Sequence, residues 1–112
     1  MVGVFFGGKA GAMACLDDKQ RLVQLIECGD KEASYRLARK LVRERPNDPE
    51  ASFLYGFLLE VDGKLCEAEN EYTRSLRLDP SDYRATYNLG NVLRKLGRFR
   101  EALDLWQRPL VT

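Results

Sequence analysis

The chain has 112 residues and a mass of 12.8 kDa, with 45% hydrophobic and 31% charged residues, which is typical of one soluble globular domain. Eighteen Lys and Arg against 17 Asp and Glu leave a net charge of +1, which argues against a nucleic-acid binder, because such proteins usually carry a basic excess. The absence of histidine excludes His-based nucleophile pairs, His metal ligands and a His pH switch.

Three cysteines, Cys15, Cys28 and Cys66, form no CxxC pair and no spacing typical of a zinc site. An odd number fits a disulfide framework poorly, so we expect reduced thiols in a cytoplasmic protein, with no metal and no other cofactor. No apolar run approaches the ~20 residues that cross a bilayer, so we expect no membrane span.

The first fourteen residues, MVGVFFGGKAGAMA, are rich in glycine, nearly uncharged and without helical periodicity. We expect residues 1–14 to be a flexible leader. Two alternatives remain open. The small residues before Cys15 resemble a signal cleavage or lipoprotein site, although a basic start is missing and Lys9 interrupts the apolar stretch. Residues 3–7 could also pack on the first helix.

The sequence repeats with a period of 34 residues, which separates Gly29 from Gly63 and Gly63 from Gly97. The same interval joins further pairs of identical residues: Pro46 and Pro80, Asp48 and Asp82, Ala51 and Ala85, Gly56 and Gly90, Leu59 and Leu93, Glu67 and Glu101, and Ala68 and Ala102. We therefore divide residues 15–112 into three copies, about 15–48, 49–82 and 83–112, of which the first is diverged.

Each copy predicts two helices on either side of its glycine, giving the ranges 16–28, 31–44, 49–61, 65–78, 83–96 and 99–108. The middle copy shows the signals most clearly. Asn47 and Asp48 are candidate N-caps, and Pro49 occupies the first helical position. Gly63 supplies a tight turn, and Pro80 ends the second helix. The pattern indicates antiparallel helices joined by short turns.

The spacing Gly-x6-Gly-x4-Ala-x3-aromatic-x7-Pro resembles the tetratricopeptide repeat (TPR) family. The residues that carry it are Gly56, Gly63, Ala68, Tyr72 and Pro80 in the middle copy, and Gly90, Gly97, Ala102 and Trp106 in the last. The resemblance implies an all-α, right-handed superhelical array of three helix-turn-helix pairs with a degenerate first copy. The small residues would allow close helix crossings, and Tyr72 and Trp106 would fill the gaps between neighbouring pairs.

Pro109 shortens the last helix, and no polar capping helix follows before Thr112. We therefore expect an exposed apolar end formed by Leu103, Leu105, Trp106, Leu110 and Val111. The chain is then either part of a longer array or a homo-oligomer that covers this end.

The resemblance also implies a concave groove, lined by the first helix of each pair, that binds a peptide or another protein. Helical geometry places three stripes of side chains along it, which are Leu16, Lys19, Gln20, Val23, Ile26 and Glu27; Glu50, Phe53, Leu54, Phe57, Glu60 and Val61; and Arg84, Tyr87, Asn88, Asn91, Arg94 and Lys95.

Among these we expect Phe53 and Phe57 to form an apolar pocket for a ligand side chain. Asn88 and Asn91 would bind peptide backbone, because an amide both donates and accepts hydrogen bonds. Arg84 and Arg94 would hold a carboxylate. In the competing interpretation the aromatic residues pack against the neighbouring repeat and the charges form a solvated face.

Other functions fit less well. A clamp for acidic chaperone tails would need side chains that Val23, Leu54 and Asn88 do not supply, although Lys19 matches and Arg84 is a conservative change. RNA-reading helical repeats usually have a basic groove, which this chain lacks. An enzyme is disfavoured because no phosphate loop or catalytic motif is present. We expect a non-catalytic adaptor or scaffold; the alternative is a structural module that self-assembles through its repeat ends.

Overall fold

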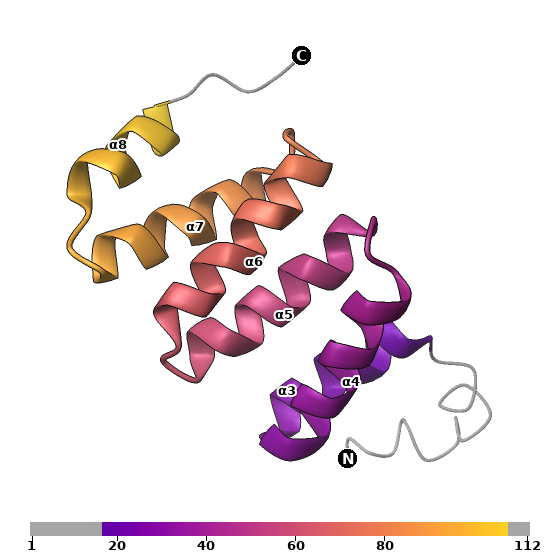
Figure 1. The fold of residues 1–112 in the computed structure, drawn as a ribbon. Helices are drawn as coiled ribbons and strands as arrows, with labels where there is room; N and C mark the ends of the chain where they lie inside the picture. Colours follow the sequence, from indigo (N-terminus) through magenta and orange to yellow (C-terminus); the bar gives the residue numbers. More distant parts are fainter. Residues whose placement is uncertain (1–16, 108–112) are drawn as a thin grey trace, which may run out of the picture.

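The computed structural model describes residues 17–107, which form six α-helices and contain no β-strand (Figure 1). The helices are α3 (Asp18–Cys28), α4 (Lys31–Glu44), α5 (Pro49–Val61), α6 (Leu65–Leu78), α7 (Tyr83–Lys95) and α8 (Phe99–Gln107). The all-α fold expected from the repeat is confirmed. The expected leader, residues 1–14, lies outside the described residues, as do Leu110 and Val111.

Aspartate residues begin four of these helices, because a carboxylate can accept hydrogen bonds from the unpaired N–H groups of a first turn. The N-caps are Asp17 for α3, Asp30 for α4, Asp48 for α5 and Asp82 for α7. The first of them forms a capping box with Gln20, whose side chain accepts a hydrogen bond from the N-cap N–H. The helix starts are thus encoded locally in the sequence.

The turn within each pair is made by a glycine in the left-handed region, where a Cβ atom is disfavoured. Gly29, Gly63 and Gly97 have φ angles of 82°, 82° and 86°. The conformation recurs at the 34-residue interval, so the repeat in the sequence is also a repeat in the backbone.

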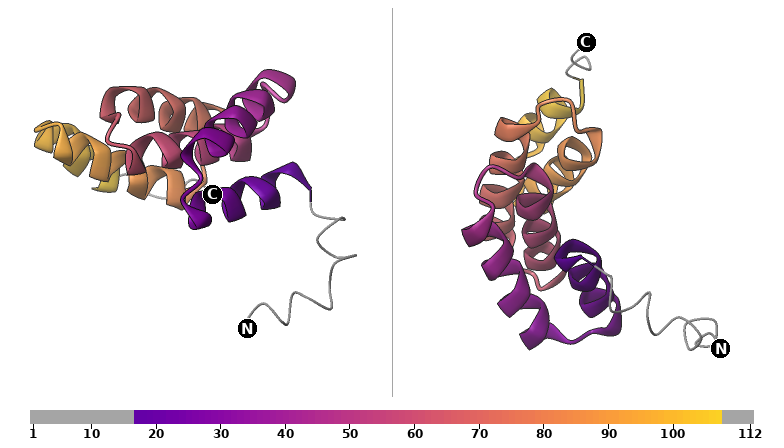
Figure 2. Two further views of the ribbon diagram at one scale, coloured as in Figure 1. Left: turned by 90° about the horizontal axis from the view of Figure 1, so that it is seen from below. Right: turned by 90° about the vertical axis from the view of Figure 1, so that its right-hand side faces the viewer.

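The three pairs, α3–α4, α5–α6 and α7–α8, are stacked along the molecule (Figure 1) and follow a curved path in the right-hand view of Figure 2. Each helix packs on its neighbour in the chain, and α5 also contacts α3 and α7. The central helix is therefore covered on several sides, and it buries Ala51, Ser52, Phe53, Leu54, Gly56, Leu58 and Leu59.

The predicted close crossing in the middle pair is confirmed at Gly56. A Cβ atom added there would lie 2.9 Å from the ring of Tyr72, which is completely buried. Ala68, on the same helix as Tyr72, is also fully buried. The small residues of the motif thus allow α5 and α6 to approach closely.

The predicted apolar end needs one correction. Leu103 and Trp106 are 52% and 39% exposed, as expected, but Leu105 is only 5% exposed. Leu105 follows the buried Ala102 by three residues, so it lies on the face of α8 that packs against α7. The prediction for Leu105 was wrong because the helical period places it on the core face.

Candidate peptide-binding groove

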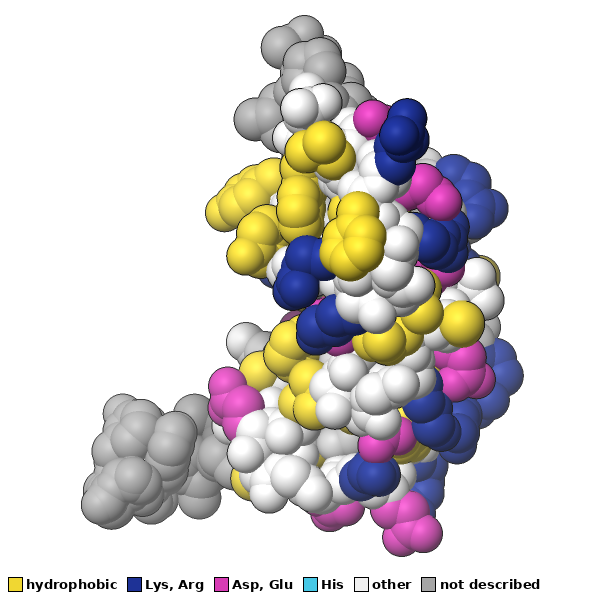
Figure 3. All heavy atoms as spheres, turned by 90° about the vertical axis from the view of Figure 1, so that its left-hand side faces the viewer, with side chains coloured by type: hydrophobic (Ala, Val, Ile, Leu, Met, Phe, Trp, Pro, Cys, Tyr) yellow, Lys and Arg dark blue, Asp and Glu magenta, His cyan; other side chains and the backbone are white. Residues whose placement is uncertain are grey.

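A pocket of about 270 Å³ opens on the side of the molecule where α3, α5 and α7 run next to one another. Its lining comes from all three helices and consists of Val23, Ile26, Glu27, Phe53, Leu54, Phe57 and Asn88. Figure 3 shows the molecule hollowed on its left-hand side, between an upper and a lower group of hydrophobic side chains. Pockets for whole small molecules usually have ~300–1,000 Å³, so this one suits a single large side chain.

Phe53 and Phe57 have different roles in this pocket. Phe53 is 8% exposed and packs on Tyr72 with 5.7 Å between ring centroids, so it forms part of the core as well as the pocket floor. Phe57, one helical turn later, is 38% exposed. It therefore offers the aromatic surface that a ligand can reach, and the competing core interpretation applies mainly to Phe53 and to Leu54.

Asn88 reaches the pocket from α7 and belongs to a chain of polar contacts. Its Nδ2 lies 3.4 Å from the hydroxyl oxygen of Tyr72, to which it donates. That hydroxyl donates to Glu60 at 2.8 Å, and Lys95 Nζ lies 3.2 Å from the other carboxylate oxygen. Burial and the hydrogen bond to Glu60 raise the pKa of Tyr72, which keeps it a neutral donor. Asn88 is thereby oriented, and no described residue donates to its Oδ1.

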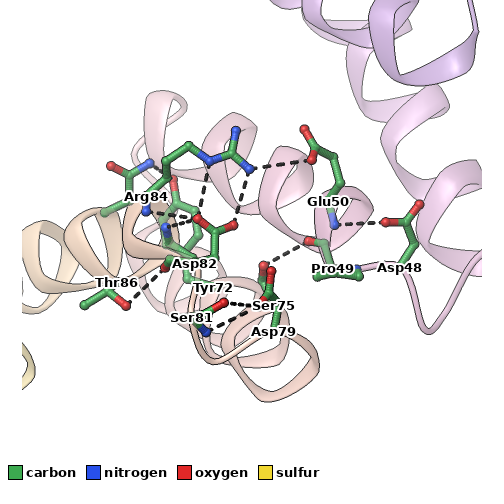
Figure 4. A network of polar contacts seen from close by, with 12 residues as sticks. Asp48, Pro49, Glu50, Tyr72, Ser75, Asp79, Ser81, Asp82, Arg84 and Thr86 are labelled. Carbon is green, nitrogen blue, oxygen red and sulfur yellow. Dashed lines mark hydrogen bonds and ion pairs between the residues drawn. The ribbon is translucent and has the colours of Figure 1, made fainter. Parts of the chain in front are cut away.

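Arg84 stands beside the pocket, held by two acidic side chains of the preceding copy (Figure 4). Its guanidinium lies 3.3 Å from Asp82 and 3.5 Å from Glu50, and its central carbon is 4.5 Å from the ring centroid of Phe53. Burial acts to raise the pKa of Asp82, but hydrogen bonds from the side chain and the backbone N–H of Arg84 outweigh it and lower that pKa. An incoming carboxylate would have to share Arg84 with these partners.

The structure does not bring all six predicted site residues together. Phe53, Phe57 and Asn88 line one pocket, with Arg84 at its edge. Asn91 is partly buried and Arg94 is exposed, and neither lines this pocket.

The α3 contribution of Val23, Ile26 and Glu27 was within the predicted groove stripe but not among the predicted site residues. Tyr72 was expected only to pack, yet its hydroxyl connects α5 to α7. The signal for the α3 residues was their spacing of three and four residues, which places them on one face of the helix.

Residues 17–107 bring no three Cys, Asp or Glu side chains into a metal-binding group. Cys28 and Cys66 are exposed free thiols. None of the helices in this range combines the length and the apolar character that crossing a bilayer requires.

Comparison with known proteins agrees with the repeat. The tetratricopeptide repeat family model matches residues 61–110. The human protein O-mannosyl-transferase TMTC2 is 39% identical over 80 residues, which is 69% of this chain but only 9% of the human protein.

Solved structures with the same helical arrangement are MamA from Desulfovibrio magneticus RS-1 and YrrB, with TM-scores of 0.75 and 0.72. Their identities are 17% and 24%, so they establish the fold alone. The alignments cover 80% and 79% of this chain, and 50% and 45% of the solved chains, so this chain spans about half of each. YrrB is described as a TPR protein with an unusual peptide-binding site. The family-model match over residues 61–110 supports the assignment of this chain to the tetratricopeptide repeat family, and the solved structures share its fold.

Proposed function

We propose that this chain is a non-catalytic module that binds an extended segment of another protein, as an adaptor or scaffold in the cytoplasm. Residues 15–112 form the binding domain, and the ligand lies along α3, α5 and α7. The observation that carries the proposal is the apolar pocket between these helices, which is large enough for one anchoring side chain. The TPR fold and the peptide-binding description of YrrB support the same class of function.

The ligand is anchored by an aliphatic or aromatic side chain between Phe57 and the α3 residues Val23 and Ile26. Asn88, oriented by Tyr72, accepts a backbone N–H of the ligand through its Oδ1. Arg84 attracts acidic residues at the edge of the pocket, in competition with Asp82 and Glu50. Asn91 and Arg94 contribute farther along α7. No nucleic acid and no cofactor takes part.

Phe57→Asp tests this proposal. Peptides are first selected from a random display library on the wild-type protein, and their dissociation constants are then measured. Phe57→Asp should weaken binding at least tenfold, because it places a charge in an apolar pocket. Phe99→Asp is the matched control: it makes the same substitution on α8, at a position that is 64% exposed and does not line the pocket. Equal binding by both variants would contradict the proposal.

A second function, self-assembly, is favoured by a group of exposed hydrophobic side chains on α7 and α8. These are Tyr83, Tyr87, Phe99, Leu103 and Trp106. Such a surface could bind a second copy of the chain. Light scattering after size exclusion, over a range of concentrations in reducing buffer, distinguishes the two. A mass near 12.8 kDa favours the adaptor, and a dimer that Leu103→Glu dissociates favours self-assembly.

A further inference from the structure

A second and larger cleft, of about 770 Å³, lies between α4 and the turn that joins α5 to α6. It is lined by Lys31, Glu32, Tyr35, Arg36, Arg39 and Arg43 of α4, and by Asp62 and Lys64. None of these residues lines the concave pocket. In Figure 3, Lys and Arg side chains gather along the right-hand edge of the molecule, on the side away from the hollow. The cleft is thus a separate surface with its own chemistry.

The cleft is strongly basic in a chain whose net charge is only +1. Its carboxylate Asp62 already has partners, since Lys31 Nζ lies 2.7 Å from it, Lys64 Nζ 3.8 Å, and the Tyr35 hydroxyl donates to it at 2.7 Å. By contrast, three arginines of α4 line the cleft, namely Arg36, Arg39 and Arg43. Their guanidinium groups form no ion pair with any described residue. They remain available to an anionic ligand.

Two of the cations are positioned by an aromatic ring. Tyr35 is largely buried, and its ring centroid lies 5.1 Å from the guanidinium carbon of Arg39 and 5.0 Å from Lys64 Nζ. Cation–π contacts of this kind restrict long side chains before a ligand arrives. The entropy lost when a carboxylate binds is then smaller than for freely rotating side chains.

We propose that this cleft binds an acidic segment of a partner protein, independently of the concave groove. Arg36, Arg39 and Arg43 follow one another at intervals of three and four residues, so they share one face of α4. The helical rise separates them by ~4.5 and ~6 Å along the axis. Side chains on one face of an extended peptide repeat every ~6.6 Å. An extended segment with Asp or Glu at alternate positions therefore approximately matches the row of arginines, each of which can pair bidentately with a carboxylate.

Other anionic partners match the cleft less well. A nucleic acid needs a longer basic surface, whereas here Glu32 and Asp62 interrupt the positive charge. A membrane surface is flat over this scale, whereas Tyr35 and the cations that flank it line a recess.

The test is fluorescence anisotropy with a labelled ten-residue peptide in which Glu and Ser alternate. The double variant Arg36→Gln/Arg43→Gln should bind about tenfold more weakly than wild type, because two charge-assisted contacts are lost. The control double variant Arg77→Gln/Arg100→Gln changes the net charge equally, at exposed positions on α6 and α8. It should bind like wild type, and a peptide with Gln in place of Glu should not bind.

Three results would overturn the proposal. The first is no binding of the acidic peptide to wild type, and the second is equal weakening in both double variants, which would reflect net charge alone. The third is tighter, Arg36- and Arg43-dependent binding of a ten-nucleotide uridine RNA or of phosphatidylserine vesicles, which would assign the cleft to those ligands. Circular dichroism checks that all variants fold, and none of these results depends on the concave groove.

Discussion

The indole of Trp106 on α8 lies so close to Gly90 on α7 that a Cβ atom added to Gly90 would overlap its Nε1 and adjacent ring carbons. Trp106 also stacks on Tyr87, with 6.1 Å between ring centroids, and its Nε1 donates to the Tyr87 carbonyl at 3.4 Å. The last pair therefore repeats the glycine–aromatic contact that Gly56 and Tyr72 make in the middle pair.

Gly90→Leu should lower the melting temperature and move Trp106 out of its stack with Tyr87. Overpacking of a close crossing costs ~1–3 kcal/mol. Trp106 is the only tryptophan, so its fluorescence emission should shift to longer wavelength as the ring becomes more exposed. Arg94→Leu, at an exposed position on the same helix, is the control and should change neither property. Unchanged stability and emission in Gly90→Leu would mean that Gly90 is not at the crossing.

Glu71 on α6 is a site where a neutral side chain should stabilise the fold at pH 7. Burial raises the pKa of Glu71, the positive charge of Arg74 offsets this only in part, and no described residue hydrogen-bonds to its Oε1. A pKa raised in the folded state gives stability that is present below the unfolded pKa and is lost as the pH rises through the folded pKa. At neutral pH the ionised carboxylate is therefore unfavourable.

Glu71→Gln should accordingly raise the melting temperature by a few degrees at pH 7, and the difference should shrink as the pH falls and Glu71 becomes protonated. Differential scanning calorimetry at several pH values measures this. Glu67→Gln, which is exposed on the same helix, should have little effect at either pH. A lower melting temperature for Glu71→Gln at pH 7 would show that the carboxylate has a partner that stabilises it.

Asp82 combines a capping role with an ion pair, and two substitutions separate them. Its carboxylate accepts from the N–H groups of Arg84 and Ala85 at 3.0 and 3.4 Å. Asp82→Ala loses both the cap and the ion pair and should cost at least ~1 kcal/mol. Asp82→Asn keeps the capping oxygen and should cost less. Urea denaturation of the two variants at pH 7 checks the order, and an equal loss would mean that the ion pair with Arg84 dominates.

The pH dependence of Asp82 has the opposite sign to that of Glu71. Because the folded-state pKa of Asp82 lies below its ordinary value, its contribution is present above the unfolded pKa of about 4 and is lost as the pH falls through the folded pKa. Wild type should therefore lose stability between pH 5 and pH 3 more steeply than Asp82→Asn. Parallel curves of unfolding free energy against pH for the two proteins would show that Asp82 makes no such contribution.

The helices could be predicted from the sequence because their starts and ends depend on local chemistry. An Asp N-cap and a left-handed glycine act within a few residues of their own position. The crossings at Gly56 and Gly90 could also be predicted, since the repeat places a small residue and an aromatic side chain at a fixed interval. The exposure of Leu105 was predicted wrongly, because nearness to the end of the chain does not determine burial. Its position on the core face of α8 does.

The candidate site could be predicted less completely, because it depends on how side chains of different repeats meet. Helical geometry placed Phe57 and Asn88 on the groove side, and both line the pocket. It could not show that Arg84 would pair with Glu50 of the preceding repeat. The basic cleft was missed although Arg36, Arg39 and Arg43 form a stripe, because its other wall is the turn of the next pair.

The two asparagines of α7 should differ in their effect on binding. Asn88→Ala should weaken binding of a display-selected peptide several-fold, because it removes the pocket amide, whereas Asn91→Ala should have little effect because Asn91 lies outside the pocket. Replacing both should weaken binding only slightly more than Asn88→Ala alone and leave the helical circular dichroism signal unchanged. If Asn91→Ala weakens binding more than Asn88→Ala, the ligand lies farther along α7 than proposed.

The most direct test of the concave pocket is nuclear magnetic resonance of the isotope-labelled protein, titrated with the tightest display-selected peptide. We expect the largest changes in chemical shift at residues on three different helices, Val23, Ile26, Phe57 and Asn88, and we expect Phe57→Asp to abolish them. Changes confined to α4, or to the exposed hydrophobic residues of α7 and α8, would contradict this expectation and would place the working surface elsewhere on the array.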